Sequence, residues 1–329
     1  MITTNDLYKI GRLKFAMVYL MSTSGTTSLT RESLLGTVAN RDFIDLVSSQ
    51  MAFPGSRGKG LPILRVSTPL FTAHIALQGA QLLSFQAKGG KPLLWTSPNC
   101  DFSPGVALRG GIPVCLPWFG PHPTNPKLPK HGFARNRDWQ LTNAHCSPSG
   151  EAELVFDFDS PADELFAYSF SARLTMTLGS SIKLNLSITN TDTHSFDCSW
   201  ALHSYYPVSS LNEVRVLGLS GKIYLDNLEQ HAVKNQYGDV DFHAEVDRVF
   251  PDINNDIRIS GSPQIQIEHH NCPSVIVWNP GHINAAKIVD IGAGHEQEYI
   301  CVERGAVLSE KWTLTANETR SAWMKIKAI

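Results

Sequence analysis

Two titratable side chains lie inside apolar and aromatic segments of the chain and could exchange protons with a ligand. His203 lies within CSWALHSYYPVS (198–209), and Glu303 lies within EYICVERG (298–305). An imidazole can give a proton near neutral pH and a carboxylate can take one, so the two would form a general acid and base pair. Taken singly, each also fits a structural role, the histidine as a satisfied core residue and the carboxylate as a partner of Arg304 or of another arginine. Proton transfer is therefore predicted only if the two segments meet.

A stiff loop presents Arg109 at the start of RGGIPVCLPWFG (109–120). Its two glycines permit positive φ angles and its prolines fix φ, so the backbone is both sharply bent and rigid. A guanidinium offers a planar fork of donors that matches a carboxylate or a phosphate. The arginine could equally cap buried carbonyl groups, and this loop by itself leaves both interpretations open.

A second stretch, PHPTNPKLPKHGFARNRDW (121–139), brings further cations close to Arg109 in the sequence. If the two loops converge, they would form a pocket for a dianion such as a phosphate monoester. The alternative is a solvated basic loop, although the apolar residues after His131 favour a segment that dips inward. The potential cations of this stretch are Lys127, Lys130, His131, Arg135 and Arg137.

Aromatic residues near these segments could supply the flat apolar surfaces on which sugar rings stack. No metal centre is predicted, because the adjacent His269 and His270 would point to opposite faces of a strand and have no second ligand cluster. The sequence also contains no G-x-S-x-G elbow, Walker loop or dinucleotide fingerprint. The candidate stacking surfaces are Trp118, Phe119, Trp200, Tyr205 and Trp278.

Short alternating runs dominate the chain from Leu61 onward and predict the elements that must position these residues. In SIKLNLSITNT (181–191), apolar and polar residues alternate, which is typical of a strand with one packed and one solvated face. Comparable runs recur to the C-terminus without helices between them. We therefore predict one all-β domain of antiparallel sheets, a sandwich or barrel, over residues 52–329. Residues 1–51 are predicted to form an N-terminal extension with a helix at 31–50.

The composition excludes several classes of partner. The 329 residues carry a formal net charge of -2, so no basic surface for nucleic acid or anionic lipid is expected. No apolar run approaches the roughly 18 residues that a membrane span needs. Six scattered cysteines without a C-x-x-C pair indicate reduced thiols rather than a disulfide framework. We expect a cytoplasmic, monomeric protein whose partner is a small molecule.

Six motifs occur along the chain in the order RGGIPVCLPWFG, LPKHGFARNRDW, ALHSYY, VDRVF, VWNP and CVERG. In this order they resemble the D-hexose-6-phosphate mutarotase branch of the aldose 1-epimerase (galactose mutarotase-like) superfamily, over about residues 60 to 327. The resemblance implies a β-supersandwich of two large antiparallel sheets with a sugar-binding groove on the concave side. It also implies that neither a metal nor an organic cofactor is needed.

The resemblance further assigns chemical roles. It makes His203 the general acid and Glu303 the general base in an interconversion of the α and β anomers of glucose 6-phosphate and related hexose 6-phosphates. It implies that Arg109 and Arg135 hold the 6-phosphate, with Lys130 as a helper. This assignment predicts acid and base at one end of the substrate and cations at the other.

Three further site residues follow from the same motifs. His131 and Asp247 would form hydrogen bonds with sugar hydroxyls, and Asn279 would lie near the groove. Arg304 is a departure, because the family usually has a small residue or proline there, and its charge could neutralise Glu303. A non-catalytic sugar-phosphate-binding or sensing protein on the same scaffold is therefore an alternative, as is a mutarotase for unphosphorylated sugars such as galactose.

Overall fold

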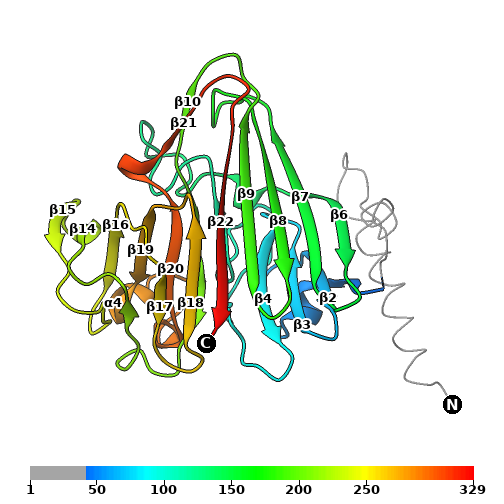
Figure 1. Ribbon diagram of the computed structural model, residues 1–329, viewed down its shortest axis with the longest axis horizontal. Helices are drawn as coiled ribbons and strands as arrows, with labels where there is room; N and C mark the ends of the chain where they lie inside the picture. The colour runs from blue at the N-terminus through cyan, green and yellow to red at the C-terminus, as the bar shows by residue number, and fades with distance from the viewer. Residues whose placement is uncertain (1–41) are drawn as a thin grey trace.

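The computed structural model describes residues 42–329, whose regular structure consists almost entirely of strands in antiparallel sheets (Figure 1). The predicted all-β class is thereby confirmed. Two sheets of eight strands each make up most of the molecule, and a four-stranded and a two-stranded sheet complete it. Helical segments in the described part are short: α3 (Ser49–Ala52), α4 (Gly281–Ala285), η1 (Ala134–Asn136), η2 (Asn227–Glu229), η3 (His295–Glu298) and η4 (Leu308–Glu310).

The first eight-stranded sheet has the order β15-β14-β16-β19-β20-β11-β5, and β12 also pairs with β20. Every residue of β20 is buried, so its alternating side chains enter two different covered environments. The strands are β5 (Val114–Cys115), β11 (Trp200–Leu202), β12 (Tyr205–Pro207), β14 (Ile223–Asp226), β15 (Ala232–Asn235), β16 (Val246–Phe250), β19 (Ser274–Asn279) and β20 (Tyr299–Ala306).

The second eight-stranded sheet has the order β13-β17-β18-β22-β9-β8-β7-β6. In Figure 1 the long strands β22, β9, β8 and β7 follow one another across the front of the molecule. The strands are β6 (Gln140–Cys146), β7 (Ala152–Ser160), β8 (Phe170–Leu178), β9 (Ile182–Asn190), β13 (Val216–Leu217), β17 (Ile257–Ile259), β18 (Ile265–His270) and β22 (Thr319–Ala328).

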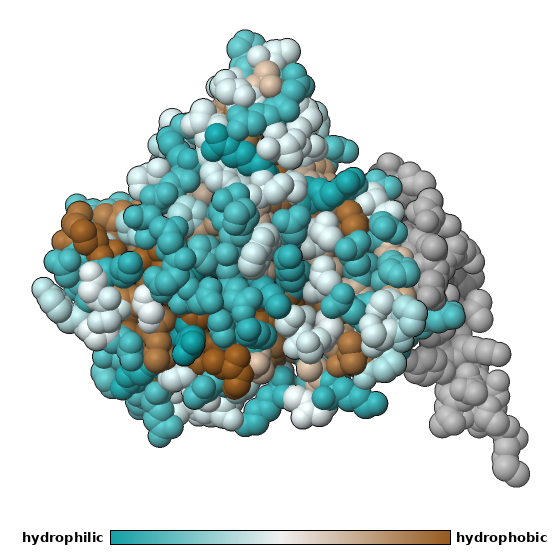
Figure 2. Space-filling view, in the orientation of Figure 1, coloured by the Kyte–Doolittle hydropathy of each residue, from teal (hydrophilic) through white to brown (hydrophobic). Residues whose placement is uncertain are grey.

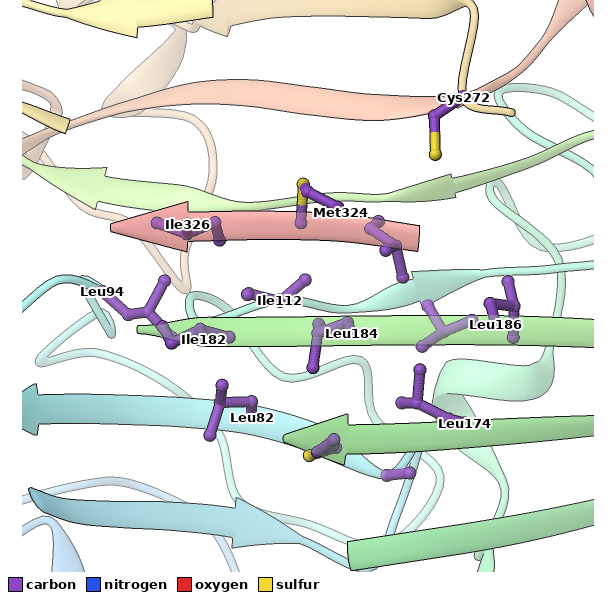
Figure 3. Close-up of a cluster of buried hydrophobic side chains, with 14 of the residues drawn as sticks. Leu82, Leu94, Ile112, Leu174, Ile182, Leu184, Leu186, Cys272, Met324 and Ile326 are labelled. Atoms are coloured by element: carbon purple, nitrogen blue, oxygen red, sulfur yellow. The ribbon is translucent and has the colours of Figure 1, made fainter. Parts of the chain in front are cut away.

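Alternating residues of the second sheet build the main core. In β9, Ile182 and Leu184 are buried, whereas Lys183 between them is partly exposed. Figure 3 shows these apolar side chains together with Leu82 from β4, and all of them belong to one buried cluster. Each fully buried aliphatic side chain of this kind stabilises the fold by about 1.5–3 kcal/mol. Packing of one face of β9 into this core thus leaves the residues of its opposite face partly exposed.

The four-stranded sheet corrects part of the predicted N-terminal helix. Within the segment predicted as helix, Ile44 pairs with Val66 and Ser48 pairs with Pro62 in an antiparallel ladder. The buried positions Ile44 and Val47 suit a helical turn as well as a strand, and pairing with a neighbouring strand decides between them. The β-structure thus begins before residue 52, and the part of the predicted extension up to residue 41 lies outside the described residues. The strands are β1 (Ile44–Ser48), β2 (Pro62–Ser67), β3 (Phe71–Ala76) and β4 (Gln81–Ala87).

The remaining small sheet joins β10 (Phe196–Cys198) to β21 (Trp312–Leu314). Figure 2 shows that the face toward the viewer is largely hydrophilic, with hydrophobic surface at the edge that carries β14 and β15 and in patches along the lower part of the molecule. On those strands Ile223 and Val233 are exposed. Within residues 42–329, no helix has the length and apolar character to span a membrane.

Candidate active site

His203 and Glu303, which are far apart in the sequence, meet on the first sheet. Glu303 projects from β20, and His203 lies in the short link between β11 and β12, which both pair with β20. The amide of His203 donates to the carbonyl of Pro113 at 2.9 Å and so anchors this link. His203 Nε2 lies 3.3 Å from Glu303 Oε1, and the two residues are 6% and 1% exposed. The structure therefore places an imidazole and a carboxylate within reach of one ligand atom or of each other.

Burial controls the charge of this pair. It lowers the pKa of His203 well below 6.5, and the nearby His131 and Arg135 lower it further. Burial likewise raises the pKa of Glu303 well above 4.5, an effect that Asp247 reinforces and Arg135 opposes. Both shifts disfavour ions in a poorly hydrated site. A proton shared by the pair is thus held by the carboxyl group, and the imidazole is neutral.

Two polar atoms of the pair have no protein partner. Nδ1 of His203 and Oε2 of Glu303 are both buried and form no hydrogen bond with any described residue. Buried polar atoms in native proteins are nearly always paired. Fourteen buried side-chain atoms of the described residues lack a partner, and these two lie on the groups that would transfer protons, where a substrate could satisfy them.

Arg109 lies in the glycine-rich loop, where Gly110 (φ 119°) and Gly111 (φ 62°) adopt the positive φ that the sequence predicted. Its Nε and Nη2 donate to the two carboxylate oxygens of Asp290 at 3.0 and 3.2 Å, and its Nη1 donates to the Tyr205 hydroxyl at 3.0 Å. Burial lowers the pKa of Arg109, but Tyr205 and Asp290 outweigh it and raise that pKa above its ordinary value. Arg109 is therefore a fixed and permanently charged group.

The second basic loop also reaches the site. Arg135, on η1, donates through Nη2 to the carbonyl of Lys130 at 2.9 Å, and its buried Nε has no partner among the described residues. Its charge affects the pKa values of both His203 and Glu303. Lys130 itself is exposed. The structure therefore brings Arg135 to the same region as the acid and base pair, with Lys130 beside it at the solvent boundary.

His131 is held at this loop by an unusual backbone. It has a φ of 65°, Gly132 after it has a φ of 67°, and its Nδ1 accepts a hydrogen bond from the amide of Gly120 at 3.3 Å. Its ring meets that of His203 edge to face, with centroids 5.7 Å apart. Burial, with help from Arg135, lowers the pKa of His131 well below 6.5. At neutral pH His131 is therefore a neutral hydrogen-bonding group.

Asp247 approaches from β16, whose register places it beside Trp278, and Trp278 in turn beside Cys301 of β20. Asn227 Nδ2 donates to its Oδ1 at 2.7 Å. Burial raises the pKa of Asp247 to about 6, while the Asn227 hydrogen bond lowers it. Glu303 lies two residues after Cys301 on β20, and so on the same face, which places the two carboxyl groups on one side of the first sheet.

Asn279 does not fit the predicted place near a substrate. Its side chain is fully buried, donates to the carbonyls of Glu296 and Tyr299 at 2.9 Å each, and accepts from the amide of Gly281 at 2.9 Å. It follows Trp278 in β19, and neighbouring strand residues face opposite sides. We assign Asn279 to the support of the segment after β19 rather than to sugar binding.

Arg304 is also turned away from the site. It follows Glu303 on β20 and so points to the opposite side, where its Nη1 donates to the carbonyl of Ile253 at 2.9 Å and its Nη2 donates to that of Asn255. Burial lowers its pKa to about 10, and Arg304 is not among the groups that shift the pKa of Glu303. The concern that Arg304 neutralises the base is thus removed.

Replacing Arg304 with methionine tests this structural role. We expect the free energy of unfolding to fall by about 2–5 kcal/mol, because several buried carbonyls lose a charged donor. Urea denaturation measures that loss, and the pH dependence of any sugar exchange should keep its wild-type shape. Unchanged stability, or a shifted pH profile, would contradict the assignment.

The candidate stacking surfaces divide into core and site residues. Trp118 and Trp200 are buried, the first donating to the carbonyl of Pro129 at 2.9 Å and the second packing against Trp312. Phe119 and Trp278 stay partly exposed, and the Trp278 ring lies edge to face with that of His203 at 6.1 Å. Tyr205 is buried, and what it offers the site is its hydroxyl group.

Asp290 is the site residue that the sequence did not reveal. It lies in a loop after α4, within KIVDIGAG, and no motif or periodicity separates it from other surface acids. Its importance comes only from its contact with Arg109. Among residues 42–329, no group of three or more histidine, cysteine or acidic side chains is arranged to hold a metal ion.

The chain is similar to known proteins of one family. The family described as Aldose 1-epimerase matches residues 62–327. The chain is 36% identical over 252 residues to a Cenchrus ciliaris protein named "Putative glucose-6-phosphate 1-epimerase", covering 71% of this chain and 75% of that one. A protein of the same name from Escherichia coli (strain K12) is 33% identical over 253 residues, covering 74% and 82%.

Solved structures show the same fold. The crystal structure of a protein from Salmonella typhimurium, described as a "putative mutarotase (YeaD)", superimposes with a TM-score of 0.75 at 29% identity, covering 81% of this chain and 90% of that one. The antiparallel sheets define a galactose mutarotase-like fold. The family match and the sequence relatives place this chain, within that fold, in the aldose 1-epimerase family, a family of isomerases.

Proposed function

We propose that the protein interconverts the α and β anomers of glucose 6-phosphate and related hexose 6-phosphates. One observation carries the proposal: a buried imidazole and a buried carboxylate, 3.3 Å apart, lie in the same electrostatic environment as two arginines. Acid and base suit the anomeric end of a sugar, and arginines suit a phosphate. The sequence relatives named for glucose-6-phosphate 1-epimerase activity support this substrate class.

Ring opening needs two proton transfers. Ring opening starts from the form of the pair in which the proton of Glu303 has passed to His203 across the 3.3 Å between them. Glu303 then takes the proton of the O1 hydroxyl, His203 as imidazolium gives a proton to the ring oxygen O5, and the C1–O5 bond breaks to leave an open-chain aldehyde. Rotation about C1–C2 exposes the other face of the carbonyl, and reversal of both transfers closes the ring as the opposite anomer. Each such transfer contributes roughly 100- to 10,000-fold to the rate.

The shifted pKa values of the pair favour the stage of the reaction at which the open-chain aldehyde exists. After ring opening, Glu303 is protonated and His203 is neutral, and this is the protonation state that burial prefers. The free energy needed to form the two ions in this buried site before ring opening is released when the pair becomes neutral again at the aldehyde stage. The same groups then return the protons, so no net proton is consumed.

The cations would hold the other end of the substrate. Arg109 is fixed by Asp290 and Tyr205, whereas Arg135 has a buried Nε with no partner. These groups, with the exposed ammonium of Lys130, would bind the 6-phosphate, and His131 and Asp247 would bind sugar hydroxyls. Such anchoring makes the reaction at C1 effectively intramolecular.

Two-dimensional exchange NMR on glucose 6-phosphate tests the proposal directly. Purified protein is expected to increase the rate of α to β exchange above that in buffer. Exchange at the buffer rate, with sugar phosphate bound, would instead support the alternative of a binding or sensing protein. The structure weakens that alternative, because Arg304 is turned away from Glu303.

Replacing Arg135 with alanine tests the choice of a phosphorylated substrate. The preference for glucose 6-phosphate over glucose should fall by about 10- to 100-fold, the size of one lost charge-assisted contact of 1.5–3 kcal/mol. The measurement is the ratio of kcat/KM values for the two sugars.

The matched control is Arg137→Ala in the same loop. Arg137 pairs with Asp163 at 2.8 Å and lies over the ring of Phe133 at 4.1 Å, so its loss should leave the ratio unchanged. An equal loss in both variants would mean that the loop acts through its general positive charge. An unchanged ratio in Arg135→Ala would favour an enzyme for unphosphorylated sugars.

The proposal also includes a cytosolic location. All six cysteines are free, and burial raises the pKa of every one of these thiols, that of Cys100, Cys115 and Cys272 to about 12. Unreactive thiols with no disulfide suit a reducing compartment.

A further inference from the structure

Asp290 holds the arginine that the proposed function assigns to the phosphate. Its two carboxylate oxygens accept from Nε and Nη2 of Arg109 at 3.0 and 3.2 Å. The side chains of Arg109 and Asp290 are only 23% and 24% exposed. A bidentate pair with little exposure has a defined geometry, unlike a solvated surface ion pair.

The backbone on both sides of Asp290 is anchored. Arg57 donates through Nη1 to the carbonyl of Val289 at 3.3 Å, and Asn99 donates through Nδ2 to the carbonyl of Ile291 at 2.8 Å. Ile291 is fully buried. Asp290 is therefore presented to Arg109 from a fixed support.

The contacts continue from Arg109 to the acid and base pair. Nη1 of Arg109 donates to the hydroxyl of Tyr205 at 3.0 Å. The ring of Tyr205 stacks on that of His203, with centroids 4.9 Å apart and planes 9° apart. A continuous series of contacts thus joins Asp290 to the imidazole through Arg109 and Tyr205.

Counting donors shows what remains for a ligand. A guanidinium has five N–H donors, and three of those on Arg109 are used by Asp290 and Tyr205. One N–H remains on each terminal nitrogen, which is enough to bind two phosphate oxygens. The carboxylate meanwhile offsets the charge of Arg109, so Asp290 weakens the attraction of an anion at a distance while it fixes the direction of the short contacts.

We propose that Asp290 is a positioning residue that orients Arg109 toward the phosphate and sets the distance between that phosphate and His203. The inference rests on the proposed function for the identity of the ligand. Of the two opposing effects of Asp290, the orientation of Arg109 outweighs the loss of charge.

Asp290→Ala, made both in the wild type and in an Arg109→Ala variant, separates the orientation of Arg109 from the loss of charge. The measurement is calorimetric titration with glucose 6-phosphate. In the wild-type background, Asp290→Ala should weaken binding about tenfold, because Arg109 loses its orientation. In an Arg109→Ala background, the same change should strengthen binding, because the carboxylate there only repels the phosphate. Asp290→Asn, which keeps one acceptor oxygen, should bind with an affinity between those of the wild type and Asp290→Ala.

A role through charge alone gives a different pattern. Asp290→Ala would then strengthen binding in both backgrounds, and that result would overturn the proposal. The matched control is Asp157→Ala, which removes an equally bidentate partner of Arg173 on the second sheet, at 2.7 and 2.8 Å, and should leave binding unchanged. Because the titration measures binding, a wild-type protein that binds the sugar phosphate without speeding exchange would contradict the proposed function but not this inference.

Discussion

Glu303→Gln is expected to slow the anomer exchange of glucose 6-phosphate by about 100- to 10,000-fold, the range that one general base contributes. The amide keeps the shape of the side chain but cannot take the O1 proton. Binding of the sugar phosphate should change little, because the cations at the other end of the substrate are intact. Exchange NMR gives the rate and calorimetric titration gives the affinity.

The same substitution should stabilise the protein as pH rises. Burial raises the pKa of Glu303 in the folded state well above the 4.5 of the unfolded chain. The folded wild type then holds a proton that the unfolded chain has lost, so its stability falls as pH rises toward the folded pKa. Glutamine does not titrate. The melting temperature of Glu303→Gln minus that of the wild type should therefore increase from pH 5 to pH 8.

Glu268→Gln on the second sheet is the control for both measurements. Glu268 bonds Lys327 and faces away from the core, so its exchange rate should match the wild type and its melting temperature should show no comparable gain. A Glu303→Gln variant that exchanges anomers at the wild-type rate would remove Glu303 from the mechanism. A stability difference independent of pH would show that Glu303 is ionised in the folded protein.

The candidate site was predictable where strand alternation governs it. His203 and Glu303 each stand in an apolar run, and only a strand that pairs both segments lets them meet. The same alternation puts Arg304 on the opposite side of β20 from Glu303. The sequence pattern thus already indicated that the Arg304 charge does not face the Glu303 carboxyl group. Asn279, predicted near the groove, bonds the backbone carbonyls of Glu296 and Tyr299, whereas its neighbour Trp278 contacts His203.

Other features depend on contacts that no local pattern encodes. Asp290 matters because it meets Arg109 across 181 positions, and its adjacent residues Val289 and Ile291 are apolar. The strand β1 was predicted as a helix because Ile44 and Val47 suit both periods, and only its pairing with β2 selects the strand. Contacts between segments that are far apart in the sequence, rather than local propensity, therefore decide the conformation of β1 and the role of Asp290.

Gly132→Ala is expected to cause the largest loss of stability. Gly132 has a φ of 67°, and a Cβ there would be driven into the carbonyl group of Leu116. That carbonyl cannot retreat, because it accepts from the amides of Phe133 and Ala134 at 3.0 and 3.1 Å. Left-handed backbone costs about 1–2 kcal/mol, and the overlap with backbone should bring the total above about 4 kcal/mol. Urea denaturation measures this loss in the free energy of unfolding.

Gly120→Ala separates the free-energy cost of atomic overlap from the cost of placing alanine in a left-handed backbone conformation. Gly120 has a similar φ of 73°, but a Cβ there would meet no atom within 4 Å, so only the cost of about 1–2 kcal/mol should remain. Gly132 also connects His131 to the segment that carries Arg135, so its variant should lose binding of the sugar phosphate together with stability, whereas the Gly120 variant should keep it. Equal losses of stability would show that φ alone, and not the contact with Leu116, requires glycine at position 132.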